Sequence, residues 1–216
     1  MKKIFTLSDQ KKFSELSHDF NPIHLEKEWA EKEYPGKIVV YGISVLLWAL
    51  EFSNHPRNIS RIKTKFIQPI LINDIVRLKT NLNEDNQVFL IYVKDKLVAK
   101  IQCFYGNQDL LEYLDNNTKN NISNIPRELS YEEIANDKGL IFTPLNTDEV
   151  ILAYPKICKY TGITGVRALL SLSRLVGMYC PGLRSIFSGF DIIFEENNHE
   201  LSYKVNSINK SLGFTK

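Results

Sequence analysis

The fold follows from one stretch of the first half, Gly42-Ile43-Ser44-Val45-Leu46-Leu47-Trp48-Ala49-Leu50, which is apolar on nearly every side. A helix that is hydrophobic all round has to be enclosed by other elements. The residues that follow can supply the enclosure, because Ile62, Thr64 and Phe66 alternate with basic residues, and this is the period of a half-buried strand. We therefore expect an α+β protein in which an antiparallel sheet wraps around a central apolar helix.

Further elements are expected on both sides of this helix. Strands are predicted over 76–79, 88–93 and 97–105, with a hairpin turn at Lys94-Asp95-Lys96. Earlier in the chain, Ser8 is expected to cap a helix over 9–16, and a charged helix is expected over 26–33. The segment between these two helices is bent, because a proline at position 22 moves Asn21 out of the helical region.

The second half repeats this order incompletely. Residues 107–124 are polar and rich in Asn, which predicts a linker or a surface excursion. Ser130 and Glu133 have the spacing of a capping box, and an apolar helix follows Gly165 and ends at Pro181-Gly182. Strands are then expected over 186–194 and 201–205. This order indicates a weak internal duplication. Either the second unit is degenerate, or the 216 residues are the front part of a longer protein.

Composition narrows the classes of function. The chain has 27 basic and 25 acidic residues and a net charge of +2, so we expect no nucleic-acid partner. Its longest apolar run, Gly42 to Leu50, is about half of the roughly 18–20 residues that a membrane span needs. The three cysteines, Cys103, Cys158 and Cys180, form no C-x-x-C pair, which argues against a disulfide framework or a zinc site. We expect a cytoplasmic protein without a metal or a cofactor.

The bent segment contains Asp19-Phe20-Asn21-Pro22-Ile23-His24. It resembles the hydratase motif of the MaoC-like, R-specific enoyl-CoA hydratase family, which reads Asp, any residue, Asn, Pro, Ile or Leu, His. The segment Ile38-Val39-Val40-Tyr41-Gly42 is similar to the Ile-Val-His-Gly entry to that family's central helix. The likeness covers about residues 8 to 106, and several spaced features agree in order, which makes it more specific than one short pattern.

The resemblance implies a hot-dog fold, in this chain as a double hot-dog whose second unit is degenerate or incomplete. We expect a MaoC-like hydratase domain over 1–106, a linker over 107–128 and a second hot-dog-like unit over 129–216. Uncovered sheet edges favour pairing of such units. The pair is expected either as a homodimer or within one chain.

The resemblance also implies a chemistry, the reversible hydration of a 2-enoyl thioester carried on CoA or on an acyl carrier protein, as in fatty acid metabolism. Asp19 and His24 would be the catalytic pair that activates water, since one group must remove a proton from water while another delivers one to carbon. Gly42 would donate its N–H to the thioester oxygen, and Tyr41 and Asn21 would complete the substrate-binding site.

Two departures from the family pattern keep other readings open. Tyr41 stands where the family usually has His, and Leu50 stands where some members have a serine that lines the site. Asp, Asn and Pro also favour turns for local reasons, so the motif could be a turn without chemistry. The alternatives are a non-catalytic module that binds acyl thioesters, or a thioesterase.

Overall fold

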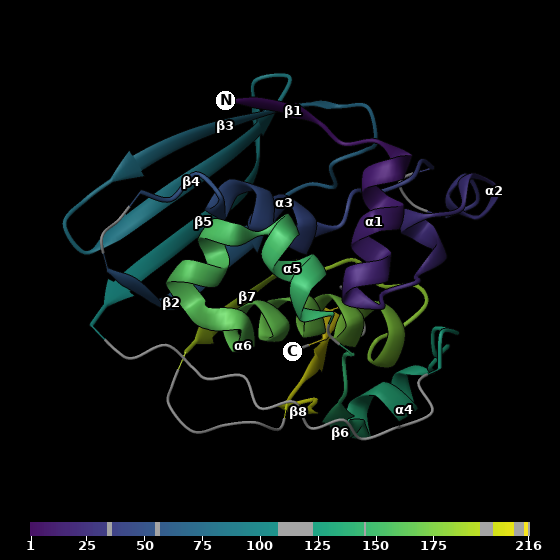
Figure 1. The fold of residues 1–216 in the computed structure, drawn as a ribbon. Helices are drawn as coiled ribbons and strands as arrows, with labels where there is room; N and C mark the ends of the chain where they lie inside the picture. Colours follow the sequence, from purple (N-terminus) through teal and green to yellow (C-terminus); the bar gives the residue numbers. More distant parts are fainter. Residues whose placement is uncertain are drawn as a thin grey trace.

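The protein is built on a six-stranded antiparallel sheet in the order β1-β3-β4-β5-β2-β7 (Figure 1). The computed structural model describes residues 1–33, 36–54, 57–107, 123–144, 146–194, 201–209 and 214–215. The strands of this sheet are β1 (Lys2–Ile4), β2 (Asn58–Phe66), β3 (Ile75–Leu82), β4 (Asn86–Val93), β5 (Lys96–Gly106) and β7 (Gly189–Ile193).

The strands of the first half lie where the alternating pattern predicts them, and each is longer than predicted. The predicted hairpin is confirmed: Lys94 and Asp95 both have positive φ angles, 46° and 66°, and join β4 directly to β5. This is the backbone that a two-residue hairpin turn requires. The pattern missed β1, whose three residues gain their place only by pairing with β3.

Helix α3 (Gly42–Leu50) is the enclosed apolar helix. Ile43, Leu46 and Leu50 are fully buried and share one hydrophobic core with Ile62 of β2 and Phe89 of β4. A sheet wrapped around one buried helix is the hot-dog arrangement, so the predicted α+β class is confirmed (Figure 1).

The helices before α3 differ from the predictions at their ends. Helix α1 (Leu7–Ser17) is capped by Thr6 and not by Ser8, because Asp9 completes a capping box with Thr6 in both directions. After the single turn η1 (Pro22–His24), helix α2 (Lys27–Ala30) is shorter than predicted. No side chain caps its first turn, and a short helix without a cap gains little stability.

The second half contributes α4 (Tyr131–Asn136), β6 (Lys138–Ile141), α5 (Thr147–Ala153), α6 (Pro155–Arg174), the π-helical turn η2 (Leu175–Tyr179), β8 (Leu201–Lys204), β9 (Ile208–Asn209) and β10 (Phe214–Thr215). The capping box of Ser130 and Glu133 is present. The predicted apolar helix begins ten residues earlier than Gly165, at Pro155, and runs across a kink at Gly162. Its first turn accepts a partner from the first half, because the Glu51 carboxylate receives the N–H groups of Lys156 and Ile157 at 3.3 and 2.9 Å.

The two halves share one core. Helix α6 packs beside α3, and β7 pairs antiparallel with β2 at the edge of the sheet, Thr64 lying opposite Phe190. A strand from the second half of the same chain therefore covers the β2 edge, and the expected pairing of two hot-dog units stays a prediction. Within the described residues, β7 alone brings the second half into this sheet, since β8 pairs with β6 instead. The unit boundaries 1–106 and 129–216 stay predictions, and most of the predicted linker (108–122) lies outside the described residues.

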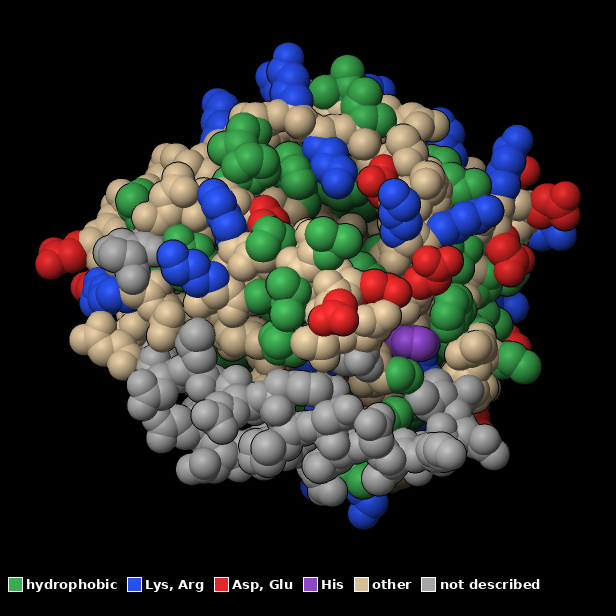
Figure 2. Space-filling model, viewed as in Figure 1, with side chains coloured by type: hydrophobic (Ala, Val, Ile, Leu, Met, Phe, Trp, Pro, Cys, Tyr) green, Lys and Arg blue, Asp and Glu red, His purple; other side chains and the backbone are tan. Residues whose placement is uncertain are grey.

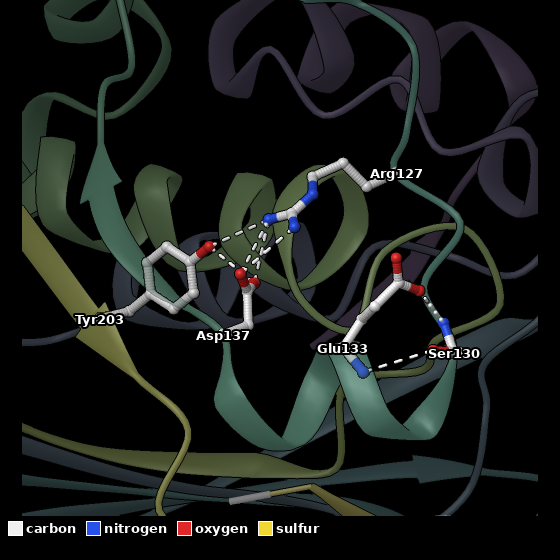
Figure 3. A network of polar contacts seen from close by, with 5 residues as sticks. All are labelled: Arg127, Ser130, Glu133, Asp137 and Tyr203. Atoms are coloured by element: carbon white, nitrogen blue, oxygen red, sulfur yellow. Dashed lines mark hydrogen bonds and ion pairs between the residues drawn. The ribbon is translucent and has the colours of Figure 1, made fainter.

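A polar cluster fixes the elements of the second half that lie away from the sheet. Figure 3 shows the Arg127 guanidinium facing the Asp137 carboxylate, with the Tyr203 hydroxyl close to both groups. Tyr203 of β8 donates to Asp137 at 2.8 Å, and Arg127 lies 3.0 Å from the same carboxylate. The cluster thus joins β8 to the segment that precedes α4.

The surface carries both signs of charge. On the face shown in Figure 2, basic and acidic side chains are interspersed among apolar ones. No helix in the described part of the chain is long and apolar enough to cross a membrane. Across the same residues, no three His, Cys, Asp or Glu side chains are grouped so that they could hold a metal ion.

The shared core predicts that truncating a side chain of the second half destabilises the whole protein. Leu169 of α6 is fully buried in this core, so we expect Leu169→Ala to lower the free energy of unfolding by about 2–5 kcal/mol. Chemical denaturation followed by circular dichroism measures the change. Leu152→Ala is the matched control because Leu152 is 84% exposed. Two separate unfolding transitions, with only one shifted by Leu169→Ala, would contradict a shared core.

Candidate functional site

The loop between α1 and α2 is bent by local hydrogen bonds. His18 ends α1 with a left-handed backbone, φ 52°, which turns the chain sharply. Asn21 then caps the η1 turn, its side-chain oxygen accepting the N–H of Ile23 at 3.2 Å, while Pro22 occupies the first helical position. Two changes of direction within four residues turn Asp19 and His24 toward the same space.

That space is a cavity of about 530 Å³. Asp19 and His24 of the bent loop line it, together with Tyr41 and Gly42 at the start of α3. The second half contributes the opposite wall, which includes Ser173, Val176, Gly177 and residues 185–188. The volume falls within the range of small-molecule sites.

Asp19 is a buried carboxyl group, 2% exposed, held by two donors. The Ser173 hydroxyl donates to its Oδ2 at 2.7 Å, and the Asn21 backbone N–H donates to its Oδ1 at 3.2 Å. Burial raises the pKa of Asp19 to about 7, against the opposing effect of these two donors and of the Arg174 charge. The group therefore changes its charge near neutral pH.

The turn η2 forms the floor on which this carboxyl group lies. A Cβ atom at Gly177 would lie 2.2 Å from Asp19 Oδ1, so only glycine leaves room for the carboxyl group here. The Gly177 carbonyl also accepts the Asn21 side-chain amide at 3.2 Å. A π-helical turn inside an α-helix is often found at functional sites, because it alters the path of the backbone locally.

Arg174 binds the backbone of the loop between α1 and α2. Its side chain is fully buried, and it donates to the carbonyls of His18 and Ser123. Its guanidinium lies 5.4 Å from the centre of the Tyr179 ring. A buried cation is costly unless such groups solvate it. Arg174 therefore fixes the backbone immediately before Asp19 and places a positive charge near it.

His24 is oriented by a backbone carbonyl. Its Nδ1 lies 2.8 Å from the Val39 oxygen, and a carbonyl can only accept, so we assign the proton of the neutral ring to Nδ1. Nε2 then carries a free lone pair. Burial lowers the pKa of His24 to about 4, so the ring is neutral at pH 7.

Tyr41 supports both members of the pair. Its hydroxyl donates to the Asp19 backbone carbonyl at 2.5 Å, and its ring lies 3.9 Å from the His24 ring, centre to centre, with 32° between the planes. The Tyr41 backbone N–H donates to the Gln10 side chain at 3.0 Å. Tyr41, which stands where the resemblance leads us to expect histidine, is thus a buried residue that holds Asp19 and His24 in position.

Gly42 opens helix α3 toward the cavity. The first amides of a helix have no intrahelical partner, and Tyr41, which precedes them, makes no capping bond with its side chain. Phe66 lies over Gly42 so closely that a Cβ atom there would be 2.9 Å from the ring. The free N–H groups and the positive end of the helix dipole suit an oxygen that gains negative charge.

The structure brings four of the five predicted site residues together around one cavity: Asp19, His24, Tyr41 and Gly42. Asn21 is fully buried and is not among the lining residues, so its contacts are with the protein scaffold. Leu50 is fully buried in the core and does not reach the cavity either.

Sequence reasoning missed the wall that the second half supplies. Ser173, Arg174 and Gly177 interrupt the apolar helix, where arginine and glycine are both unfavourable without a special reason. These polar and glycine residues in an apolar helix are the sequence feature that could have indicated a functional role. Without the fold, nothing indicates that these residues face Asp19.

The geometry agrees with the comparison with known families. The family model described as the MaoC like domain matches residues 3–102. This stretch is therefore similar to a MaoC-like domain. This stretch contains the bent loop, α3 and most of the sheet, including the four cavity-lining residues Asp19, His24, Tyr41 and Gly42.

Solved structures extend the likeness of fold beyond the MaoC-like domain. A MaoC-like dehydratase, 10% identical, matches over 97% of this chain and 87% of its own, with a TM-score of 0.62. This match shows that the similarity of fold includes the second half. An (R)-hydratase from A. caviae involved in PHA biosynthesis is 22% identical over 48% of this chain and 88% of its own, with a TM-score of 0.42. An R-hydratase from Pseudomonas aeruginosa is 16% identical over 55% and 88%, with a TM-score of 0.43. A search of curated protein sequences found no match.

The close contact between Gly177 and Asp19 predicts that two glycine-to-alanine substitutions differ in their effect on stability. We expect Gly177→Ala to destabilise the protein by about 1–3 kcal/mol, since the added methyl overpacks the site and displaces the carboxyl group. Gly139→Ala is the control, because its Cβ would meet only the Tyr203 ring at 3.2 Å, away from the cavity. Thermal unfolding of both variants measures the difference. Equal stability of the two variants would show that Asp19 does not rest on Gly177.

Proposed function

We propose that the protein hydrates 2-enoyl thioesters to 3-hydroxyacyl thioesters, and catalyses the reverse dehydration, with Asp19 and His24 as the catalytic pair. The likeness to known proteins supports this chemistry, because the model of the MaoC like domain matches residues 3–102 and solved R-hydratases are among the structures that resemble this stretch. The observation that carries the proposal is the single cavity that holds a carboxyl group, an imidazole and the start of α3.

In the proposed hydration, His24 is the base and Asp19 is the acid. The free Nε2 of His24 takes a proton from water as the water oxygen bonds to C3 of the enoyl group. The electrons of the double bond move toward the thioester carbonyl, whose oxygen becomes negative. Asp19 then gives its proton to C2, so that H and OH have been added across the bond. The new Asp19 carboxylate faces the new imidazolium, and their opposite charges stabilise each other until the proton returns.

The two pKa values fit these roles. Asp19, with a pKa of about 7, still carries its proton in a large fraction of molecules at neutral pH. His24, with a pKa of about 4, is almost entirely neutral there. Strongly shifted pKa values in a cavity are characteristic of catalytic sites, and this favours an enzyme over a module that only binds.

The first turn of α3 stabilises the oxygen that becomes negative. The Gly42 N–H is proposed as the donor, and the absence of a capping side chain leaves it available to the substrate. Removal of one such donor costs on the order of 2.7–4 kcal/mol of barrier in enzymes where it has been tested. Gly42 is therefore as important to the proposal as the catalytic pair.

The direct test is hydration of crotonyl-CoA and longer enoyl thioesters, followed by loss of enoyl absorbance. We expect Asp19→Asn and His24→Ala each to lower kcat by about 10²–10⁴-fold, since each removes a proton-transfer group. Asp95→Asn and His18→Asn are the controls: Asp95 is on the surface in an ion pair with Arg77, and asparagine tolerates the left-handed backbone of both positions.

The same assay separates the competing functions. Release of free thiol without hydration would identify a thioesterase, and binding of enoyl thioesters without turnover would identify a non-catalytic module. Full activity in both Asp19→Asn and His24→Ala would refute the assigned pair.

The pH dependence follows from the same two groups. Hydration requires protonated Asp19 and neutral His24, so kcat/KM should be level between about pH 4 and pH 7. Above pH 7 we expect a tenfold fall for each further pH unit, because Asp19 loses its proton. Initial rates between pH 5 and 9 measure the alkaline limb. A rate that rises through pH 7 would instead make the ionised Asp19 the base and reverse the roles.

A further inference from the structure

The six-stranded sheet has a covered face and an outer face. Successive side chains of a strand point to opposite faces of a sheet. Ile62 of β2 and Phe89 of β4 belong to the covered face, because both are fully buried in the core around α3. Their neighbours Lys63 and Leu90 are exposed and half-buried, respectively, and belong to the outer face.

The outer face is basic. Within the described strands β1 to β5 there are many Lys and Arg residues but no Asp or Glu. The basic side chains that alternate onto the outer face are Lys2, Arg61, Lys63, Lys65, Arg77, Lys79 and Lys100. The chain as a whole has a net charge of only +2, so positive charge is concentrated on this face.

Two of these lysines lie directly opposite each other. Lys65 of β2 pairs with Lys100 of β5. Lys79 of β3 lies in the same transverse row, on the far side of Leu90 of β4. Neighbouring strands are about 4.7–4.9 Å apart, so like charges in directly opposite positions repel each other and destabilise the sheet. An anionic partner on the outer face would relieve this repulsion.

The arginines of the outer face are engaged within the protein. Arg61 donates through Nε and Nη2 to the two carboxylate oxygens of Asp191 at 2.7 and 2.5 Å. Arg77 forms an ion pair with Asp95 at the hairpin turn. Arginine recognises a single anion through two directed hydrogen bonds, whereas lysine acts as a point charge. The cations that remain for a partner are lysines, which suit diffuse attraction to a charged surface.

Two aromatic rings of the outer face are each in contact with a cation. The Lys79 ammonium lies 5.3 Å from the centre of the Tyr92 ring, and the Arg61 guanidinium lies 5.6 Å from the centre of the Phe104 ring. Proteins that bind single-stranded nucleic acid stack the bases on such rings. Because cations already lie over these two rings, they favour another kind of anionic partner over nucleic acid.

An exposed apolar pair borders the lysines. Ile4 of β1 lies opposite Ile75 of β3, and the two side chains are 50% and 55% exposed. Both are on the outer face, since Lys2 and Arg77 lie two residues away on the same strands. Binding to a bilayer surface increases with buried apolar area and with attraction to anionic lipids. The outer face offers both contributions side by side.

We propose that the outer face of the sheet docks on the surface of an anionic lipid bilayer, with its lysines over the headgroups and Ile4 and Ile75 in the interfacial layer. Docking is peripheral, because no helix among the described residues can span a membrane. A protein partner fits less well, since protein interfaces are depleted of lysine. None of the docking residues lines the cavity that holds Asp19 and His24.

The test is co-sedimentation of the full chain with vesicles of phosphatidylcholine alone or of phosphatidylcholine with phosphatidylserine. We expect binding only to the vesicles that contain phosphatidylserine, and a fall of about tenfold or more in the partition coefficient at high salt. Lys79→Glu/Lys100→Glu should weaken binding about tenfold or more, because it reverses two charges within the lysine row. Ile4→Thr/Ile75→Thr should weaken binding and leave its salt dependence unchanged, since it removes only apolar contact.

Lys11→Glu/Lys12→Glu is the matched control, because it changes the net charge equally at two exposed lysines of α1 and should leave binding nearly unchanged. Circular dichroism checks that each variant folds. If Lys79→Glu/Lys100→Glu does not fold, Lys79→Gln/Lys100→Gln serves instead and should weaken binding to a smaller extent.

Equal loss of binding in the two charge-reversal variants would overturn the proposal, since net charge alone would then govern binding. Failure to bind phosphatidylserine vesicles at low salt would also overturn it, as would binding to single-stranded RNA in place of vesicles. Vesicle binding is measured without an enoyl thioester, so its outcome is independent of the proposed hydration.

Discussion

The site depends on keeping the Asp19 carboxyl group out of water. A buried carboxyl group is unfavourable when charged unless donors surround it. Ser173 and the Asn21 N–H supply two hydrogen bonds, and Gly177 supplies the space. The result is a group whose charge is finely balanced near neutral pH. A more exposed Asp19 would ionise near its usual pKa and would carry a negative charge at pH 7.

The second half of the chain contributes to this burial of Asp19. Among the described residues it adds one strand, β7, to the sheet. Its helix α6 nevertheless packs against α3, and the turn η2 that follows lies directly against the loop that holds Asp19 and Asn21. The first half therefore contributes Asp19 and His24, and the second half contributes a hydrogen bond and a nearby positive charge that act on the pKa of Asp19.

Local interactions determine the bend of the loop that holds Asp19 and His24, and distant interactions determine its position. Its bend is local, fixed by the left-handed His18 and the cap at Asn21. Its position is set from elsewhere: Tyr41 holds the Asp19 carbonyl, Arg174 holds the His18 carbonyl, and Val39 holds the His24 ring. The replacement of the family's histidine by Tyr41 fits this scheme, because the longer side chain reaches both members of the pair.

The sequence by itself determined the enclosed helix α3, the strands that alternate around it, the hairpin at Lys94-Asp95 and the motif that holds Asp19 and His24. These features are readable because each depends on periodicity or on turn chemistry within a few residues. Only the tertiary structure decided that β1 joins the sheet, that Thr6 replaces Ser8 as the cap, and that Ser173, Arg174 and Gly177 complete the site. The physical reason is separation along the chain: residues 154 or more positions from Asp19 meet it only because α6 packs on α3, and no local pattern records that contact.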